Sequence, residues 1–299
     1  MKRICVLLTA LLLGLSARAD TSVWKVESAN GILYLGGTCH VLREKDYPLP
    51  PEYDAAYAKA SIVVFETDIA KATSPEMNVK LMRGCMYTDG KTTLKTVLSP
   101  AVYKKLEAYC ATVNLQLDQM KQFRPPIVLV SLTFMELGKH GIAMQGVDAH
   151  YYERAETDNK RVDSLDTLEQ QIAFIAGMGE GNEDAFVLHS LEDLGKVGER
   201  IGPLLAAWRS GDTARLENLF LKDFRKDFPK VYEQLIVKRN RAWLPRIEHY
   251  LETADTEVVL VGAAHIVGKD GLLAALKKKG YKVTRLSAPA PKPVAAGKP

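Results

Sequence analysis

The sequence predicts an α/β fold, with a central mixed, mainly parallel sheet built from two βαβ-type halves and a large helical insertion between them. Three observations predict it: short apolar runs lie near both ends of the chain, a helical pattern follows a run at each end, and the middle is mostly helical. Short apolar runs suit strands that are buried on both faces of a sheet. A strand–helix–strand order favours parallel pairing.

The strands are expected where apolar and β-branched residues gather, at Gly31–Gly36, Ser61–Glu66, Val258–Val261 and Tyr281–Leu286. Pro51–Ala60 is the expected crossover helix between the first two strands. Asp270–Lys279 is the expected helix after the third strand, and it stops at Gly280 because glycine readily adopts positive φ just past a helix end.

The helical insertion is expected at about 75–253. Ser99 and Pro100 begin one helix as N-cap and first-turn proline. Asp166 and Glu169 have the spacing that begins another. Further helices are predicted at Asp212–Lys222 and Val231–Leu251. The tail, 287–299, is rich in proline and alanine, and we expect it to be disordered.

The N-terminus, 1–19, has the pattern of a signal peptide. Lys2 and Arg3 precede the apolar run Ile4–Leu15, and an A-x-A site predicts cleavage after Ala19. The run is too short to span a bilayer, which takes about 20 residues. We therefore expect a periplasmic or secreted protein whose domain covers 20–286, with no membrane segment once the signal is removed.

The charge balance of the expected mature chain bears on the kind of partner that it binds. The expected cleavage removes three basic residues and no acidic one, so 37 Lys and Arg remain against 36 Asp and Glu. This balance lacks the basic excess of a nucleic-acid-binding protein, so no nucleic-acid partner is expected.

Three cysteines remain after the expected cleavage, and the oxidising compartment allows two alternatives for them. Either Cys85 pairs with Cys110 and Cys39 is free, or there is no disulfide at all.

Two matched motifs carry the strongest chemical signal. Gly37-Thr-Cys-His40 follows the first strand, and Gly262-Ala-Ala-His265 follows the third. Ligands bind at the carboxyl ends of strands in open α/β sheets, and a glycine there lets the backbone turn or a ligand approach. If the two strands are neighbours, both imidazoles enter one crevice, where they can bind a metal or transfer protons. The alternative is a pair of structural histidines.

Several charged residues could join this crevice. Glu66 ends a buried strand, where a carboxylate must be paired, coordinated or solvated; the alternative is a cap or surface ion pair. Asp68, two residues further on, could be a second metal ligand in this crevice or simply a loop residue. Arg239 could stabilise an oxyanion or bind a carboxylate, although its polar neighbours also suit a solvated helix face. Asp148 could present a carboxylate or cap a helix.

Two glycine-rich stretches fail as nucleotide-binding motifs. Gly84–Thr92 has five residues between its glycines where a P-loop has four, and Gly177–Gly181 departs from the dinucleotide-binding fingerprint at Asn182. Neither stretch therefore predicts a nucleotide cofactor.

Taken in order, these motifs resemble the TraB/GumN family over nearly the whole chain from residue 20 to about Leu286. The likeness is carried by an ordered set: Gly37-x-x-His40, Glu66, Asp89-Gly-Lys-Thr-Thr-Leu94, Gly146-Val-Asp148, Arg239-Asn240, and Val261-Gly262-Ala-Ala-His265 with Gly268 and Leu272. Each motif is short, and the order and spacing of the set make it specific.

The resemblance implies a relation to the Tiki proteins, which are metal-dependent peptidases that use Mn or Co. It implies that His40, Glu66 and His265 form the active centre and hold a divalent metal, with Arg239 lining it; Zn²⁺ would also suit these ligand types. We therefore expect a periplasmic metal-dependent hydrolase, peptidase-like, that acts on a peptide or protein substrate.

Two alternatives come from the wider group of erythromycin-esterase-like and ChaN-like haem-binding relatives. One is a non-catalytic protein that binds a ligand such as haem through a histidine. The other is a metal-free, esterase-like hydrolase that uses His and Glu as acid and base. Convergence of His40, His265 and Glu66 on one point would favour a catalytic centre, and a histidine facing a wide apolar slot would favour ligand binding.

Overall fold

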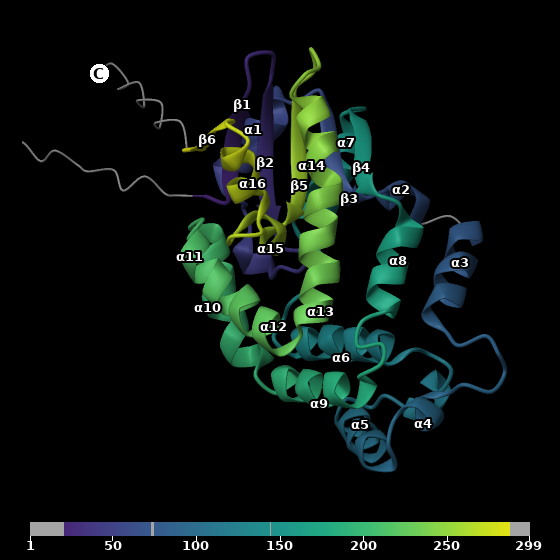
Figure 1. The fold of residues 1–299 in the computed structure, drawn as a ribbon. Coiled ribbons are helices and arrows are strands. Elements are labelled where there is room, and N and C mark those ends of the chain that lie inside the picture. The colour runs from purple at the N-terminus through teal and green to yellow at the C-terminus, as the bar shows by residue number, and fades with distance from the viewer. Residues whose placement is uncertain (1–20, 73–74, 144, 288–299) are drawn as a thin grey trace, which may run out of the picture.

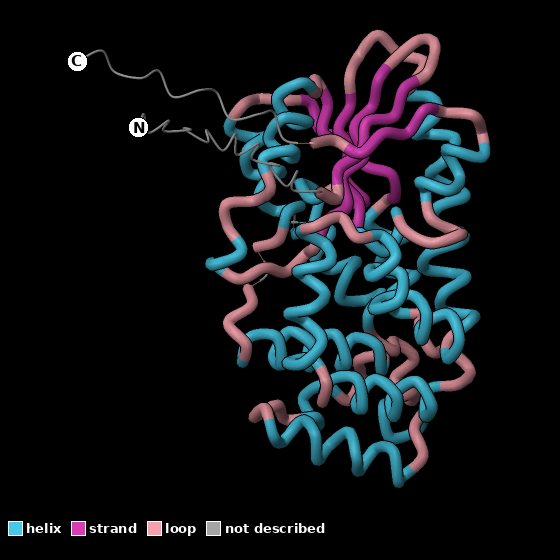
Figure 2. The backbone as a smooth tube through the Cα atoms, turned by 90° about the vertical axis from the view of Figure 1, so that its left-hand side faces the viewer, coloured by secondary structure: helices cyan, strands magenta, loops and turns pink. Residues whose placement is uncertain are grey.

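A computed structural model describes residues 21–72, 75–143 and 145–287 of the chain. The expected signal peptide, 1–19, lies outside the described residues, and so does the expected disordered tail apart from Ser287. Strands gather at one end of the molecule, and helices fill the other end (Figure 2).

The sheet of the described residues has six strands in the order β4-β3-β5-β2-β1-β6. β4, β3, β5 and β2 are mutually parallel, and β1 is antiparallel to both β2 and β6. This arrangement confirms the predicted mixed, mainly parallel sheet. The strands are β1 (Val23–Glu27), β2 (Ile32–Thr38), β3 (Ile62–Thr67), β4 (Arg161–Asp166), β5 (Glu257–Gly262) and β6 (Lys282–Arg285).

The two ends of the chain meet within the sheet, because β5 lies between β2 and β3. In the parallel pairing of β2 with β5, Gly37 stands opposite Val261 and Thr38 opposite Gly262. The two predicted strand ends therefore stop at the same level, side by side, and β3 ends beside them.

Helices cover both faces of the sheet (Figure 1). α14 and α16 lie on one face and contact each other; α1 and α7 lie on the other, where Tyr57 and Tyr151 pack with ring centroids 5.3 Å apart. The predicted crossover and C-terminal helices are thus confirmed. These helices are α1 (Pro51–Lys59), α7 (Val147–Thr157), α14 (Arg239–Tyr250), α15 (Ala263–Ile266) and α16 (Leu272–Lys278).

The remaining helices form a lobe below the sheet, with a second hydrophobic core centred on Leu106, Leu132 and Val187. Ser99 caps α5 by accepting from the Val102 N–H, as predicted. The helices are α2 (Ile69–Ala72), α3 (Pro75–Cys85), α4 (Leu94–Val97), α5 (Pro100–Thr112), α6 (Pro125–Lys139), α8 (Leu168–Ala176), α9 (Glu183–Leu194), α10 (Val197–Arg209), α11 (Thr213–Leu216), α12 (Lys222–Asp227) and α13 (Pro229–Tyr232).

Four irregular turns complete the helical structure: the 3₁₀ turns η1 (Glu44–Asp46) and η2 (Leu117–Met120), and the π-helical η3 (Glu217–Leu221) and η4 (Glu233–Lys238). η4 joins α13 to α14 without a break, so one long helical run leads from the lobe to the sheet. π-helical turns are frequent at functional sites, and η4 ends immediately before Arg239.

The predicted insertion, 75–253, needs correction because it contains a strand of the sheet. β4 lies at Arg161–Asp166 and pairs in parallel with β3. Four of its six residues are polar and its burial is partial, so no apolar run marked it. Asp166 was predicted to begin a helix; it ends β4 instead, and Thr167 caps α8 by accepting from the Gln170 N–H.

Of the two alternatives for the cysteines, the structure has the one without a disulfide, and Cys85 and Cys110 are not paired. Cys39, Cys85 and Cys110 are all free thiols; Cys110 is buried within α5, whereas Cys85 ends α3.

Among the described helices, none combines the length and apolar character that crossing a membrane requires.

Candidate functional site

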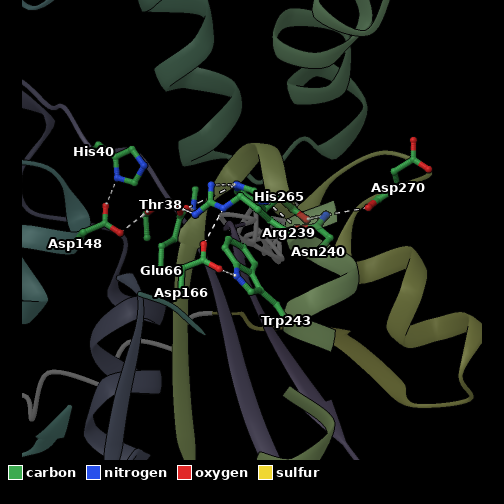
Figure 3. Close-up of polar contacts among 11 residues, drawn as sticks. Thr38, His40, Glu66, Asp148, Asp166, Arg239, Asn240, Trp243, His265 and Asp270 are labelled. Atoms are coloured by element: carbon green, nitrogen blue, oxygen red, sulfur yellow. Dashed lines mark hydrogen bonds and ion pairs between the residues drawn. The ribbon is translucent and has the colours of Figure 1, made fainter. Parts of the chain in front are cut away.

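Three side chains predicted from the sequence converge where β2, β3 and β5 end. Gly262 marks the point of convergence: a Cβ built there would lie 3.1 Å from Glu66 Oε1, 3.6 Å from His40 Nε2 and 3.8 Å from His265 Cδ2. Because glycine has no side chain, no Cβ occupies the space between the two imidazoles and the carboxylate. Figure 3 shows the residues around it.

Glu66 is buried, and both of its carboxylate oxygens accept hydrogen bonds. Oε2 accepts from Arg239 Nη2 at 2.6 Å, and Oε1 accepts from the Gly262 N–H at 2.7 Å. Burial opposes ionisation, but the charges of Arg239 and His40 and the hydrogen bond from the Gly262 N–H outweigh it and lower the pKa of Glu66 well below its usual value. The carboxylate is therefore ionised at neutral pH, with Oε1 at the edge of the open space.

Arg239 is the buried cation of the site, in the first turn of α14. Besides its bond to Glu66, its Nε donates to Asp166 Oδ2 at 2.8 Å, and its Nη1 lies 3.1 Å from His265 Nε2. Its guanidinium carbon lies 4.5 Å from the centroid of the Trp243 ring. The solvated helix face that its polar neighbours allowed is thus excluded, and the guanidinium is fixed on several sides.

Asp166 belongs to this site, although the sequence analysis assigned it a different role. It is buried, and its two oxygens accept from Arg239 Nε and from Trp243 Nε1, the latter at 2.7 Å. A signal for Trp243 was present, because it stands four residues after Arg239 and so on the same helix face. No local pattern linked Asp166 to a residue 73 positions away.

His265 is buried and neutral. Asn240 Nδ2 donates to the carbonyls of His265 and Asp270, at 3.0 and 2.8 Å, so Asn240 Oδ1 faces the imidazole and accepts from Nδ1–H at 2.8 Å. This assigns the proton to Nδ1 and leaves Nε2 to accept from Arg239. Burial lowers the pKa of His265 to about 3, despite the opposing charge of Glu66.

His40 differs from His265 in exposure and in charge. Its side chain is 59% exposed, and its Nδ1 lies 2.8 Å from Asp148 Oδ2. Thr38 donates to the other Asp148 oxygen at 3.0 Å. The negative charge of Asp148 raises the pKa of His40 to about 9, so the imidazole is charged at neutral pH, with Nε2 toward Gly262.

The chain around Asp148 is locked to the end of β2. Val147 N–H donates to the Cys39 carbonyl at 3.0 Å, and a Cβ on Gly146 would lie 2.2 Å from that same oxygen. Only glycine allows so close an approach at residue 146. Asp148 thereby sits in the first turn of α7, directly beside His40.

Asp68 does not join the centre. Its carboxylate accepts from the Lys71 N–H at 3.1 Å and pairs with Lys71 Nζ at 2.9 Å. It therefore stabilises the start of α2, which is the loop role that the sequence analysis kept as its alternative.

The fit to a divalent metal depends on which lone pairs are free. The described residues contain no group of three or more His, Cys, Asp or Glu side chains set to hold an ion. His40 Nε2 and Glu66 Oε1 face the open space. His265 Nε2 lies 4.0 Å from Glu66 Oε1, but Arg239 engages it. The arrangement therefore leaves His40 and Glu66 as the only two of the predicted ligands with a free atom toward this space, and His265 would be freed only if Arg239 shifted.

Comparison with known proteins identifies one family. A family model described as the TraB/PrgY/gumN family matches residues 22–285. No curated protein and no solved structure matches the chain.

Proposed function

Since the chain belongs to the TraB/PrgY/gumN family, we propose that it is a hydrolase of peptide or protein substrates with its catalytic centre at Gly262. The observation that carries the proposal is the convergence of His40, Glu66 and His265 on one open point beside a buried guanidinium. A charged imidazole, an ionised carboxylate and an arginine around one space form an acid–base centre.

The geometry gives each residue a role. Glu66 Oε1 is the general base that takes a proton from water in the open space, since it is ionised at neutral pH and faces that space. In the absence of an ion, charged His40 donates its Nε2 proton to the leaving group; with an ion bound at Nε2, His40 would be a ligand instead. Arg239 holds the carboxylate in position and stabilises negative charge that develops on the substrate oxygen. His265 and Asn240 fix the guanidinium from its other side.

A divalent ion is part of the leading proposal, Mn²⁺ or Co²⁺ by family resemblance or Zn²⁺ by ligand type. His40 and Glu66 would hold it. When bound, such an ion polarises a carbonyl and lowers the pKa of bound water. Binding would require His40 Nε2 to be deprotonated, so the affinity for the ion should rise with pH.

A metal-independent hydrolase is the second candidate, and the Arg239–His265 hydrogen bond favours it. That bond engages the one lone pair through which His265 could bind a metal. In this form His40 acts as the acid and Glu66 as the base, without a metal ion. Haem ligation has less support, because His265 packs 4.5 Å from Trp243 and His40 is paired with Asp148.

Calorimetric titration with MnCl₂ and ZnCl₂ separates the two candidates. We compare the wild type with His40→Ala, and with His249→Ala as a control on α14. One equivalent of ion bound by the wild type and the control, and lost in His40→Ala, supports the metal-dependent form. Peptide hydrolysis that persists in EDTA supports the metal-independent form. Absence of hydrolysis with or without added ions would refute both.

The proposal places this activity in the periplasm or outside the cell. It rests on the signal pattern of 1–19, with cleavage after Ala19. Mass spectrometry of the protein from a periplasmic fraction should find a mature chain that begins at Asp20. Recovery of the uncut chain from the cytoplasm alone would contradict this location.

A further inference from the structure

A cavity of about 840 Å³ opens beside the proposed centre. It is lined by the end of α8, the loop that leads to α9, and the helical run from α12 through η4. Its size is within the range of ligand-binding pockets, about 300–1,000 Å³. The roles proposed for the centre do not use it.

The cavity lies next to the centre, on the far side of the Phe174 ring from Arg239. Phe174 lines the cavity, and its ring centroid lies 5.7 Å from the Arg239 guanidinium carbon. Lys238, the residue before Arg239, also lines the cavity, together with Gln234. A substrate whose reacting bond lies at Arg239 would therefore have this cavity next to that bond.

The lining indicates what the cavity would accept. Phe174, Phe186 and Phe228 give it an aromatic wall, in which the last two rings meet edge to face with centroids 5.7 Å apart. Asn182 and Gln234 offer amide groups that can hydrogen-bond a peptide backbone. The charged lining residues balance, as two acids and two bases: Glu180, Asp227, Lys230 and Lys238. Such a site favours a neutral, apolar group on a polar backbone.

The glycine-rich stretch excluded as a nucleotide-binding motif forms one wall of the cavity. Gly179 and Gly181 have φ values of +74° and +77°, which favour glycine. A Cβ on Gly179 would lie 2.5 Å from the Phe186 ring, so glycine lets the loop backbone pack on the aromatic wall. The stretch thereby shapes a pocket for a side chain.

We propose that this cavity is a specificity subsite that receives an apolar, preferentially aromatic, side chain of a peptide substrate. The inference rests on the proposed function, since it places the scissile bond at the Arg239 centre. Its chemistry is that of hydrophobic pockets that discriminate between side chains by about 10- to 200-fold.

Binding of two blocked peptides tests the subsite. The probes are Ac-Ala-Ala-Phe-Ala-Ala-NH₂ and the same peptide with Asp in place of Phe, titrated into His40→Ala so that turnover does not interfere. Gln234→Trp and Lys230→Trp fill the cavity from two positions, so one can fail to fold without ending the test. Leu219→Trp, on exposed η3 outside the cavity, is the matched control.

In His40→Ala and in the control, we expect the Phe peptide to bind at least about tenfold more tightly than the Asp peptide. In the filled variants, we expect this preference for the Phe peptide to be lost. Equal binding of the two peptides, no binding, or a preference that survives in a folded filled variant would overturn the subsite. If the preference holds but the wild type cleaves neither peptide, the subsite stands and the hydrolase proposal fails. If the wild type cleaves both at equal rates, only the subsite fails.

Discussion

The charge of His40 depends on Asp148, and this dependence can be measured directly. Asp148→Asn keeps one carbonyl oxygen, which can accept from His40 Nδ1–H, so the tautomer is preserved while the negative charge is removed. The amide nitrogen then faces Thr38, whose hydroxyl oxygen can accept from it. The pKa of His40 is raised from 6.5 to about 9, chiefly by that charge. The substitution should therefore lower it.

The size of the effect follows from the exposure of the pair. His40 is 59% exposed, so water screens part of its attraction to Asp148. We expect the pKa of His40 to fall by roughly one to two pH units in Asp148→Asn. The pKa of His40 is higher in the folded protein than in the unfolded chain, so the His40–Asp148 pair contributes to the free energy of unfolding. This contribution is fully present below pH 6.5 and is lost as pH rises through about 9.

Proton NMR of the histidine ring signals measures this pKa. The chain has six histidines, and the His40 signal is the one missing from the spectrum of His40→Ala. Asp118→Asn, an exposed change on η2, is the matched control and should leave the titration unchanged. An unaltered His40 pKa in Asp148→Asn would refute the electrostatic account of this pair.

Three further changes probe the rest of the centre. Gly262→Ala adds a methyl group 3.1 Å from Glu66 Oε1, so peptide hydrolysis should fall at least about 100-fold. Because alanine tolerates the φ of −49° at this position, the melting temperature should change little. Arg239→Ala leaves Glu66 and Asp166 buried without their cation, so urea unfolding should show a loss of about 3–5 kcal/mol. The pKa of His265 lies below its unfolded value, so its contribution to stability should be lost as pH falls from 6.5 towards 3; urea unfolding of His265→Gln should show a smaller loss over that range.

The sequence was sufficient for the parts of the fold that local patterns encode. The four strands expected from apolar runs and the two helices that flank them are all present. β1 and β4 were missed because their burial is incomplete and polar residues interrupt their apolar positions. An edge strand such as β4 is recognised by its partner, β3, and not by its own composition.

The candidate site was predictable only where strand ends carry it. His40, Glu66 and His265 were found because each follows an apolar run. Arg239 stands in a polar segment that also suits a solvated surface, and its burial depends on Asp166, 73 residues away in sequence. Such pairing arises from tertiary packing, which no local spacing records.

Glu66→Gln provides the most direct test of the central claim that β2, β3 and β5 end in one hydrolytic centre. The substitution keeps the size of the side chain and removes the proposed base. Hydrolysis of the blocked Phe peptide is measured with and without Mn²⁺, and circular dichroism checks the fold. The account predicts a loss of at least about 100-fold in the folded variant. Hydrolysis at the wild-type rate by folded Glu66→Gln would contradict it.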